Sequence, residues 1–406
     1  MIHICYGIYD KDGRYSKFIG TSITSIFENT NSDVTIHILH DDTLSEENRD
    51  KFFYLAGHYS QKINFHNVEK LVPEKIAELR EKLGEVSKTK FSIGTLYRLL
   101  IPQIFSQEIS KVIYLDADII VNLDIKELWQ IELKEKILGA VPEIEIDVPT
   151  KYKLSGNYLL REKIVAAEDY FNSGVLLLNV NRLRKEEKNF FDGIKFVAEH
   201  DCGMFDQDIL NYCFSKNYFK LPPKFDIFVN VERSASGNVQ PGEKIYHYIA
   251  DTLNLDCNDK LNALWLKYFS KTPWFNFEMI NNISDGIKKL YIEQKNFAVK
   301  ISAIMSGKER AFFVHRNNLE AVKNIFGIKD SEEIIFADSP DSLKKLVQAF
   351  GSGNKLFFIL VSNYSMIHSV LSQQGFVQDK NFIDGLSFLS DAYGIPFNSH
   401  SLIKIL

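Results

Sequence analysis

The sequence predicts an α/β protein of two domains, a larger one at residues 1–272 and a smaller one at residues 273–406. Strand and helix patterns alternate through the first half of the chain, which is typical of a parallel sheet covered by helices. Within that half, the apolar run Lys111–Val121 is interrupted by two aspartates. The pattern changes near residues 270–274. A second set of strand patterns follows at residues 311–314, 333–336 and 356–361.

Each element of the larger domain has a local signal. The apolar residues of Ser16–Asn29 recur at helical spacing, and Ser45 can cap the helix that starts beside it. Val175–Val180 is almost continuously apolar, as in a strand buried on both faces. The predicted strands are residues 3–8, 34–39, 63–66, 112–115 and 175–180. The predicted helices are residues 16–29, 96–105, 190–200 and 206–215, with one more from residue 45 onward.

The bulk composition excludes several classes of function. The net charge is -5 and no block of Lys or Arg occurs, so neither nucleic acid nor a membrane surface is an expected partner. No apolar run approaches the roughly 18 residues that a membrane-spanning helix needs. The chain begins with a strand pattern, so we expect no signal peptide. The four cysteines lack the paired spacing of zinc ligands, which indicates reduced thiols in a cytoplasmic protein.

The smaller domain gives few functional signals. Its first strand pattern is not followed by the Gly-x-Gly-x-x-Gly sequence of a dinucleotide site. We therefore expect a scaffolding domain, or one that binds a protein partner.

Asp116 and Asp118 are the most informative residues of the chain. Carboxylates are costly inside a buried strand, so the pair is expected at the strand's C-terminal end. Residues i and i+2 of an extended segment project to the same side, so both carboxylates can converge on one point. Like charges this close repel unless a cation lies between them, which predicts half of a divalent-metal site. The alternative is helix capping, for which Asp124 is the better candidate because a helical pattern begins at Ile125.

Four further polar groups stand out, and each has a structural alternative. Arg98 lies among Leu residues and needs an anionic partner, from either a buried ion pair or a ligand. Phe171–Gly174 precedes a buried strand and could approach a sugar or form a turn. Asp206–Asp208 opens a helix, so capping is the alternative to binding. His247 follows a strand pattern, and a lone His is more often structural than a metal ligand.

Together and in this order, these motifs resemble glycosyltransferase family 8. The motifs are Tyr97-Arg98, Asp116-Ala117-Asp118, Phe171-Asn172-Ser173-Gly174-Val175, Asp206-Gln207-Asp208 and Ile245-Tyr246-His247-Tyr248. The resemblance covers roughly residues 1–275 and implies a GT-A fold, a Rossmann-like domain of retaining, nucleotide-sugar-dependent transferases. The chain is similar to bacterial members that build lipopolysaccharide or glycosylate surface proteins. It is more loosely similar to streptococcal enzymes that extend adhesin glycans and carry an extra C-terminal domain.

The resemblance implies a role for each matching residue. Asp116, Asp118 and His247 would bind Mn2+, or Mg2+, which also holds the diphosphate of a UDP-sugar donor. The donor hexose and the catalytic step would be served by Arg98, Asn172, Asp206 and Gln207. The residues implied in nucleotide binding are Tyr6, Gly7, Tyr9, Asp10, Ser92, Ile93 and Ala117.

The sequence leaves two alternatives for the base contact and two for the diphosphate clamp. Asp10 or Asp12 would contact the base, because residues around Lys11 leave the alignment ambiguous. The family usually follows the histidine with a Gly-Pro-x-Lys-Pro-Trp-like segment whose Lys clamps the diphosphate. Here Tyr248–Asn254 contains no lysine, so Lys260 or Lys267 is the expected substitute.

The sequence therefore predicts a retaining hexosyltransferase that uses UDP-galactose or UDP-glucose and forms an α-linkage to a glycan or glycoprotein acceptor. Acceptor contacts are expected in the loops at residues 141–168 and 225–238. Same-face substitution, with the leaving phosphate as base, is favoured over a double displacement through Gln207 or Asp206. The alternatives are a non-catalytic glycan- or partner-binding module and a nucleotidyltransferase. The latter lacks the Gly-rich, basic N-terminal loop that would hold a triphosphate.

Overall fold

The computed structural model describes residues 1–83, 93–143, 157–200, 202–236, 239–249 and 259–278, most of 303–385 and a few positions between. The chain forms two compact units that divide between Met279 and Ile280, a few residues beyond the boundary predicted at 272/273. Each unit has its own sheet and its own core.

A seven-stranded sheet in the order β3-β2-β1-β4-β7-β6-β8 forms the centre of the first unit. Its strands are β1 (Ile2–Ile8), β2 (Val34–His40), β3 (Lys62–Asn67), β4 (Lys111–Leu115), β6 (Leu138–Ala140), β7 (Val175–Asn179) and β8 (Tyr218–Lys220). The strands β3, β2, β1 and β4 are parallel, as predicted. The strand β7 is antiparallel to both β4 and β6, so the all-parallel sheet predicted from the sequence is wrong at this point.

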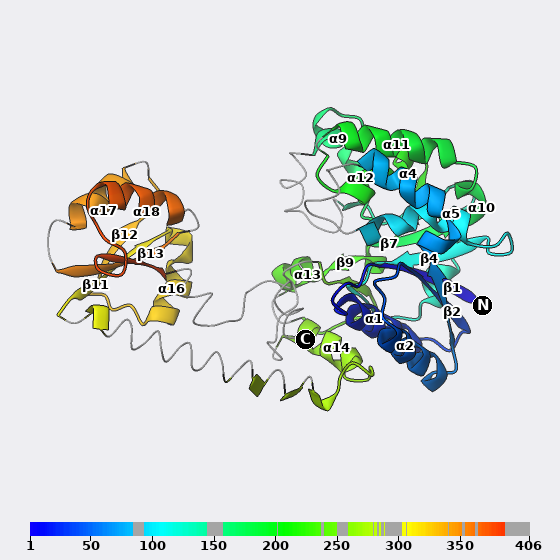
Figure 1. Cartoon of the computed structure of the whole chain (residues 1–406), viewed down its shortest axis with the longest axis horizontal. Coiled ribbons are helices and arrows are strands. Elements are labelled where there is room, and N and C mark those ends of the chain that lie inside the picture. The colour runs from blue at the N-terminus through cyan, green and yellow to red at the C-terminus, as the bar shows by residue number, and fades with distance from the viewer. Residues whose placement is uncertain are drawn as a thin grey trace. The chain divides into compact units, whose positions relative to one another are not determined.

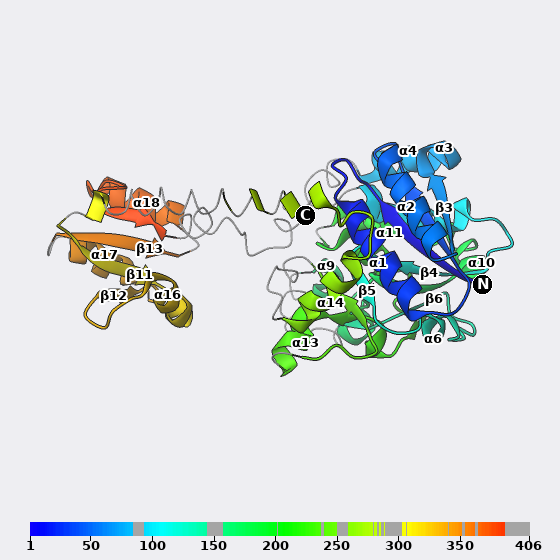
Figure 2. The same ribbon diagram turned by 90° about the horizontal axis from the view of Figure 1, so that it is seen from below.

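Helices cover both faces of this sheet (Figures 1 and 2). One face carries α1 (Tyr15–Asn29), α2 (Glu46–His58) and α14 (Lys260–Phe269). The other carries α4 (Pro73–Leu83), α5 (Ile101–Ile104), α10 (Val180–Leu183), α11 (Glu187–Glu199) and α12 (Phe205–Phe214). The predicted cap at Ser45 is confirmed, because its side chain accepts a hydrogen bond from Asn48 N at 3.2 Å.

The helix predicted at residues 96–105 is divided in the structure. Residues Ile93–Leu100 form the 3-10 helix η2, and the short helix α5 follows at Ile101. Pro102 explains the division, because it has no N–H group and its ring would clash with a carbonyl four residues earlier in a continuous α-helix. Arg98 consequently lies on a tight helical turn next to the end of β1.

A second, three-stranded sheet adjoins the first. It has the order β5-β10-β9, formed by β5 (Ile119–Val121), β9 (Ile227–Phe228) and β10 (Ile245–His247). The strand β10 is antiparallel to β5, with His247 paired to Ile119. This pairing brings the end of β10 to the turn that contains the two aspartates.

The second unit is a four-stranded parallel sheet in the order β12-β11-β13-β14. The strands are β11 (Glu309–Val314), β12 (Glu333–Phe336), β13 (Lys355–Leu360) and β14 (Phe382–Asp384). The helices are α16 (Leu319–Phe326) on one face, with α17 (Ser342–Phe350) and α18 (Tyr364–Gln373) on the other (Figure 1). The three strands predicted here from the sequence are confirmed. Among the described residues of either unit, no helix is long and apolar enough to cross a membrane.

A close contact between α1 and Trp274 holds the end of the first unit in place. Trp274 is buried, its Nε1 donates to Asn48 Oδ1 at 2.8 Å, and its ring lies against Phe52 with the centroids 4.9 Å apart. A Cβ atom on Gly20 would lie 2.2 Å from Cζ3 of this ring. Only glycine therefore fits at position 20 while Trp274 keeps its place.

The variant Gly20→Ala is accordingly expected to lower the free energy of unfolding of the first unit by about 1–3 kcal/mol, because the ring must move. Gly57→Ala is the matched control, since Gly57 is also helical but has no atom within 4 Å of an added Cβ. It should leave stability unchanged or raise it by up to about 1 kcal/mol. Tryptophan fluorescence during urea titration measures this unit alone, because all three tryptophans, Trp129, Trp265 and Trp274, belong to it. Equal effects of the two variants would contradict the packing argument.

Candidate functional site

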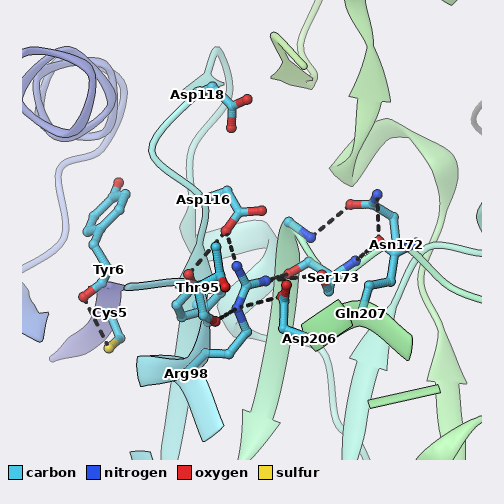
Figure 3. Close-up of polar contacts among 12 residues, drawn as sticks. Cys5, Tyr6, Thr95, Arg98, Asp116, Asp118, Asn172, Ser173, Asp206 and Gln207 are labelled. Atoms are coloured by element: carbon cyan, nitrogen blue, oxygen red, sulfur yellow. Dashed lines mark hydrogen bonds and ion pairs between the residues drawn. The ribbon is translucent and has the colours of Figure 1, made fainter. Parts of the chain in front are cut away.

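Two carboxylates and one imidazole meet where the two sheets of the first unit adjoin. Asp116 and Asp118 lie on the turn between β4 and β5, and His247 is the last residue of β10 (Figure 3 shows the two aspartates). One ligand atom from each of the three lies within 4.8 Å of the others. Asp118 Oδ1 is 3.4 Å from His247 Nε2. The structure thus brings together the three residues predicted from the sequence as metal ligands.

Main-chain hydrogen bonds fix the turn that carries the two aspartates. Asp116 N donates to Gly174 O at 2.9 Å, and Tyr248 N donates to Asp118 O at 2.8 Å. A Cβ atom on Gly174 would lie 2.4 Å from His247 Cε1, so only glycine leaves room for the imidazole. Gly174 therefore makes room for His247 beside Asp116 and Asp118. These three residues are called the metal group below.

The imidazole of His247 lies between two carboxylates. Its Nδ1 is 3.1 Å from Oδ1 of the fully buried Asp226, while its Nε2 faces Asp118. Burial alone would lower the pKa of His247, but the negative charges of Asp118 and Asp226 outweigh it and raise that pKa well above its usual value. The site thus attracts positive charge strongly.

The donor set fits a hard divalent cation. Two carboxylates and one imidazole are ligands that Mn2+ accepts well and Mg2+ accepts acceptably. Arg98 forms an ion pair with Asp116, whereas no Lys or Arg of the described segments forms one with Asp118 or Asp226. The residues present therefore leave negative charge that a bound cation would neutralise.

Arg98 connects this metal group to the residues predicted to hold a sugar (Figure 3). Its side chain is 4% exposed and its NH2 group lies 2.6 Å from Asp116 Oδ1. Its NH1 group donates to Ser173 O at 2.8 Å and Ser173 Oγ at 3.0 Å, and its Nε is 3.2 Å from Asp206 Oδ2. Arg98 also lies over the ring of Tyr114 at 4.3 Å. Of the two partners that the sequence allowed for Arg98, the structure shows the buried ion pair, and contact with a ligand stays a prediction.

The amide of Gln207 is fully hydrogen-bonded within the protein. Its Oε1 accepts from Asn172 Nδ2 and from Ser173 N, both at 3.1 Å. Its Nε2 donates to Glu143 Oε2 at 3.1 Å and to Tyr170 OH at 3.2 Å. The main-chain N–H of Ser173 can only donate, so the amide atom that faces it must be the oxygen. These contacts therefore fix which way round the amide lies.

Glu143 and Asp226 are site residues that the sequence analysis did not identify. Glu143 is 4% exposed, and its Oε2 also accepts from Asn172 Nδ2 at 3.1 Å. Burial raises the pKa of Glu143 to about 7, assisted by the negative charge of Asp226. A signal existed for Glu143, which follows the apolar strand β6 much as Asp116 follows β4. Asp226 gave none, since a single Asp between Phe225 and Ile227 has no local pattern.

The predicted sugar residues on α12 are buried at its first turn. Asp206 does not cap this helix, because its side chain faces Arg98 while the N-cap position is Met204. Burial raises the pKa of Asp206 to about 6, although Arg98 opposes the shift. Asp208 is the residue that serves the helix start, accepting from Met204 N at 2.6 Å, with Tyr170 OH bound to its other oxygen at 2.7 Å.

The predicted nucleotide residues gather at the end of β1. Gly7 and Gly94 allow close approach, because a Cβ on Gly7 would lie 2.8 Å from Gly94 O and one on Gly94 would lie 2.9 Å from Tyr9 N. Ile93 adjoins this contact, and Ala117 is half-buried between the two aspartates. Ser92 lies outside the described residues.

Two of these residues serve the fold with their side chains. Tyr6 is fully buried and its hydroxyl lies 2.8 Å from Ser22 Oγ, so a nucleotide contact there stays a prediction for the backbone only. The carboxylate of Asp10 accepts from Tyr15 N, Ser16 N, Ser16 Oγ and Asn48 Nδ2. These bonds hold the carboxylate of Asp10 at the start of α1, and contact of Asp10 or Asp12 with the base stays a prediction. Asp12 is the more exposed of the two carboxylates.

The two candidates for the diphosphate clamp lie at opposite ends of α14. Lys267 lies over the ring of Tyr268, and its charge acts on Glu28, near the C-terminal end of α1. The two aspartates act electrostatically on Tyr15, at the opposite end of α1. Lys260 begins α14, next to Leu261, whose carbonyl accepts a hydrogen bond from Tyr248 OH. Lys260 is thus the candidate on the side of His247.

Comparisons with known proteins identify the family. A family model described as glycosyl transferase family 8 matches residues 7–252, more than half of the chain. A lipopolysaccharide 1,3-galactosyltransferase of Salmonella typhimurium is 26% identical over 295 residues, which cover 70% of this chain and 82% of that protein. A lipopolysaccharide 1,2-glucosyltransferase of Escherichia coli is 29% identical over 235 residues, covering 57% of this chain and 63% of that protein. The chain thus spans less than two thirds of the E. coli relative.

A solved structure shows the same fold. The galactosyltransferase LgtC, determined in complex with donor and acceptor sugar analogues, superposes with a TM-score of 0.54 and 22% sequence identity. The superposition covers 69% of this chain and 99% of that chain. The predicted fold class, a GT-A domain with a smaller C-terminal α/β domain, is confirmed.

The buried carboxyl of Glu143 predicts a pH-dependent term in stability. Its pKa rises from 4.5 to about 7 on folding, so the folded protein keeps a proton that the unfolded chain has lost between these values. The retained proton contributes at most about 3 kcal/mol to the free energy of unfolding. This contribution is complete below the pKa of the unfolded chain and is lost as the pH rises through the pKa of the folded protein. In Glu143→Gln, the fall in unfolding free energy from about pH 5 to about pH 8 should therefore be smaller than in the wild type. Tryptophan fluorescence in urea at both pH values measures this, and an unchanged pH dependence would contradict the assignment.

Proposed function

The chain belongs to glycosyltransferase family 8, and we propose that it transfers galactose or glucose from a UDP-sugar to a glycan or glycoprotein acceptor with an α-linkage. The observation that carries this proposal is the Arg98 network. It joins the metal group, through Asp116, to the polar side chains of Asp206 and the loop at Ser173. In a nucleotide-sugar donor the hexose is attached directly to the diphosphate. The residues that hold the metal and those that hold the hexose must therefore lie side by side.

The choice of donor is supported by the relatives. The Salmonella protein is named a galactosyltransferase and the E. coli protein a glucosyltransferase. The two hexoses differ in the orientation of one hydroxyl group. The side chains of Asn172, Asp206 and Gln207 offer the kind of amide and carboxylate groups that read such a difference by hydrogen bonds.

Asp116, Asp118 and His247 would hold Mn2+, or Mg2+, and the cation would supply Lewis-acid stabilisation of the charge on the leaving UDP. Asp116 is oriented for this role by Arg98, and the main-chain bonds of Asp116 N and Tyr248 N keep the turn in place. Lys260, at the start of α14, is proposed as the second positive group at the diphosphate, and Asp12 as the contact to the base. Residues 144–156 and 250–258 lie outside the described residues.

The hydrogen bonds of Gln207 support same-face substitution as the route to retention. An amide oxygen that already accepts two hydrogen bonds is a weak nucleophile. Asp206 forms an ion pair with Arg98, which makes its carboxylate a weaker nucleophile. Because neither side chain is suited to attack the anomeric carbon, the leaving phosphate would take the proton of the acceptor hydroxyl, while the protein supplies position and electrostatic stabilisation.

We assign residues 141–143, 157–168 and 225–236 to acceptor recognition. These segments include Glu143 and Asp226, and they are not loops throughout, since they contain the helices α9 (Tyr158–Arg161) and α13 (Val229–Ser236). We assign the second unit to binding of a protein partner or of the acceptor. Cys5 and Cys213 are thiols in the structure, which supports a cytoplasmic location.

Removing either aspartate tests the metal assignment. Asp116→Ala and Asp118→Ala should each lower the transfer rate by roughly 10³-fold or more, because the charge on leaving UDP would lack its counter-ion. Both should also lose the Mn2+-dependent part of UDP binding, measured by calorimetry. The wild type is assayed with a panel of UDP-sugars by Mn2+-dependent release of UDP. Full activity of either variant, or no turnover of any UDP-hexose by the wild type, would contradict the proposal.

The proposed route to retention is tested by mass spectrometry. Wild-type protein and the variant Gln207→Glu, incubated with donor and Mn2+ but no acceptor, should show the unmodified intact mass. Gln207→Ala should lower kcat by about 10- to 100-fold through loss of positioning. A hexose adduct on residue 206 or 207 that forms as fast as turnover would establish a double displacement instead.

A further inference from the structure

The most unusual group near the site is the carboxylate of Asp226. Its side chain is 0% exposed, and Oδ1 lies 3.1 Å from His247 Nδ1. The other oxygen, Oδ2, has no hydrogen-bond partner in the part of the chain that the structure describes. A buried carboxylate is costly even when fully bonded, and an unbonded oxygen adds to that cost. Such a group needs a compensating role.

The surroundings of His247 show what that role is. The ring of Phe228 meets the imidazole edge to face, with centroids 5.3 Å apart at 85°, and Gly174 lies against Cε1. These contacts restrict the plane of the ring, but they do not decide which nitrogen carries the proton. The hydrogen bond to Asp226 does, because a carboxylate accepts and Nδ1 must then donate. When a cation takes the place of the proton on Nε2, the lone pair of that nitrogen faces the cation beside Asp118.

We infer that Asp226 is a positioning residue that makes His247 an effective metal ligand, by fixing its Nδ1–H tautomer and adding negative charge behind the imidazole. Hydrogen bonds from a metal-binding histidine to a carboxylate orient the ring and raise its basicity as a ligand. Asp226 would not touch the metal or the substrate. This inference rests on the proposed function, since it assumes that His247 binds the donor's metal ion.

Two substitutions separate the charge of Asp226 from its hydrogen bond. Asp226→Asn keeps an oxygen that can accept from Nδ1 but removes the charge, and Asp226→Leu removes both. The dissociation constant for Mn2+ is measured on the full chain with saturating UDP, by electron paramagnetic resonance of unbound Mn2+. It should rise about 10- to 100-fold in Asp226→Asn and further in Asp226→Leu.

Stability measurements distinguish positioning from structural support. Asp226→Asn keeps the shape of the side chain and an acceptor for Nδ1, so it should leave the urea midpoint close to that of the wild type, whereas Asp226→Leu breaks the buried pair and serves only the affinity comparison. The inference is overturned if Mn2+ affinity stays within about twofold of wild type in both variants. It is also overturned if affinity falls only together with a lower urea midpoint.

Asp208→Asn is the matched control, since Asp208 is equally buried but hydrogen-bonds to Tyr170 and Asn157, away from the metal group. Its Mn2+ affinity should equal that of the wild type, and a loss equal to that of Asp226→Asn would overturn the inference. Asp118→Ala in the same titration isolates the proposed function. If Asp118→Ala binds Mn2+ normally, the metal assignment itself is wrong. If it loses Mn2+ while both Asp226 variants keep it, only the role of Asp226 is wrong.

Discussion

The site depends on the burial of one guanidinium group. Taking the charge of Arg98 out of water costs several kcal/mol unless partners surround it. One partner is Thr95 O on the same 3-10 helix, and the others come from three segments that are distant in the sequence: Asp116 after β4, Ser173 before β7, and Asp206 on α12. Removal of any one partner leaves part of the charge unsatisfied. The segments are therefore held in one arrangement by the same group that faces the metal ligand.

The reversed direction of β7 makes this arrangement possible. In a parallel strand, the residues that follow it would lie at the edge with Asp116. Because β7 is antiparallel to β4, the residues that precede it lie there instead, and Val175 pairs with Leu115. The Phe171–Gly174 motif thus reaches the metal group, while Asn179 at the other end of the strand pairs with Lys111, on the opposite edge. One change of strand direction places Asn172, Ser173 and Gly174 where the chemistry is proposed.

The sequence was sufficient where the signal is local. The apolar pattern predicted β1, β2, β3, β4 and β7 of the first unit and three strands of the second, and the cost of burying a carboxylate placed Asp116 at the end of β4. It was insufficient where a partner lies far along the chain. The direction of β7 depends on its neighbours in the sheet, not on Val175–Asn179 itself. Asp226 acts through His247, and Asp10 bonds to Asn48, and both partners lie far along the chain. No pattern local to either aspartate could therefore show what it contacts.

The hydrogen bonds of Asp10 also anchor the edge of the sheet where the nucleotide is expected. Asn48 donates to Asp10 through Nδ2 and accepts from Trp274 through Oδ1, so one amide joins the start of α1 to the end of the first unit. Asp10 in turn bonds the first N–H groups of α1, and its own N–H is held by Thr43 Oγ1 at 2.8 Å. Thr43 and Tyr97 both bond to Asp41, which extends the network to the 3-10 helix that carries Arg98. The loops that would contact the nucleotide are therefore connected by side-chain hydrogen bonds both to Trp274 and to the helix of the buried guanidinium. Rigidity at this edge is a property of the network as a whole, because each of its buried polar groups is satisfied only when its neighbours are in place.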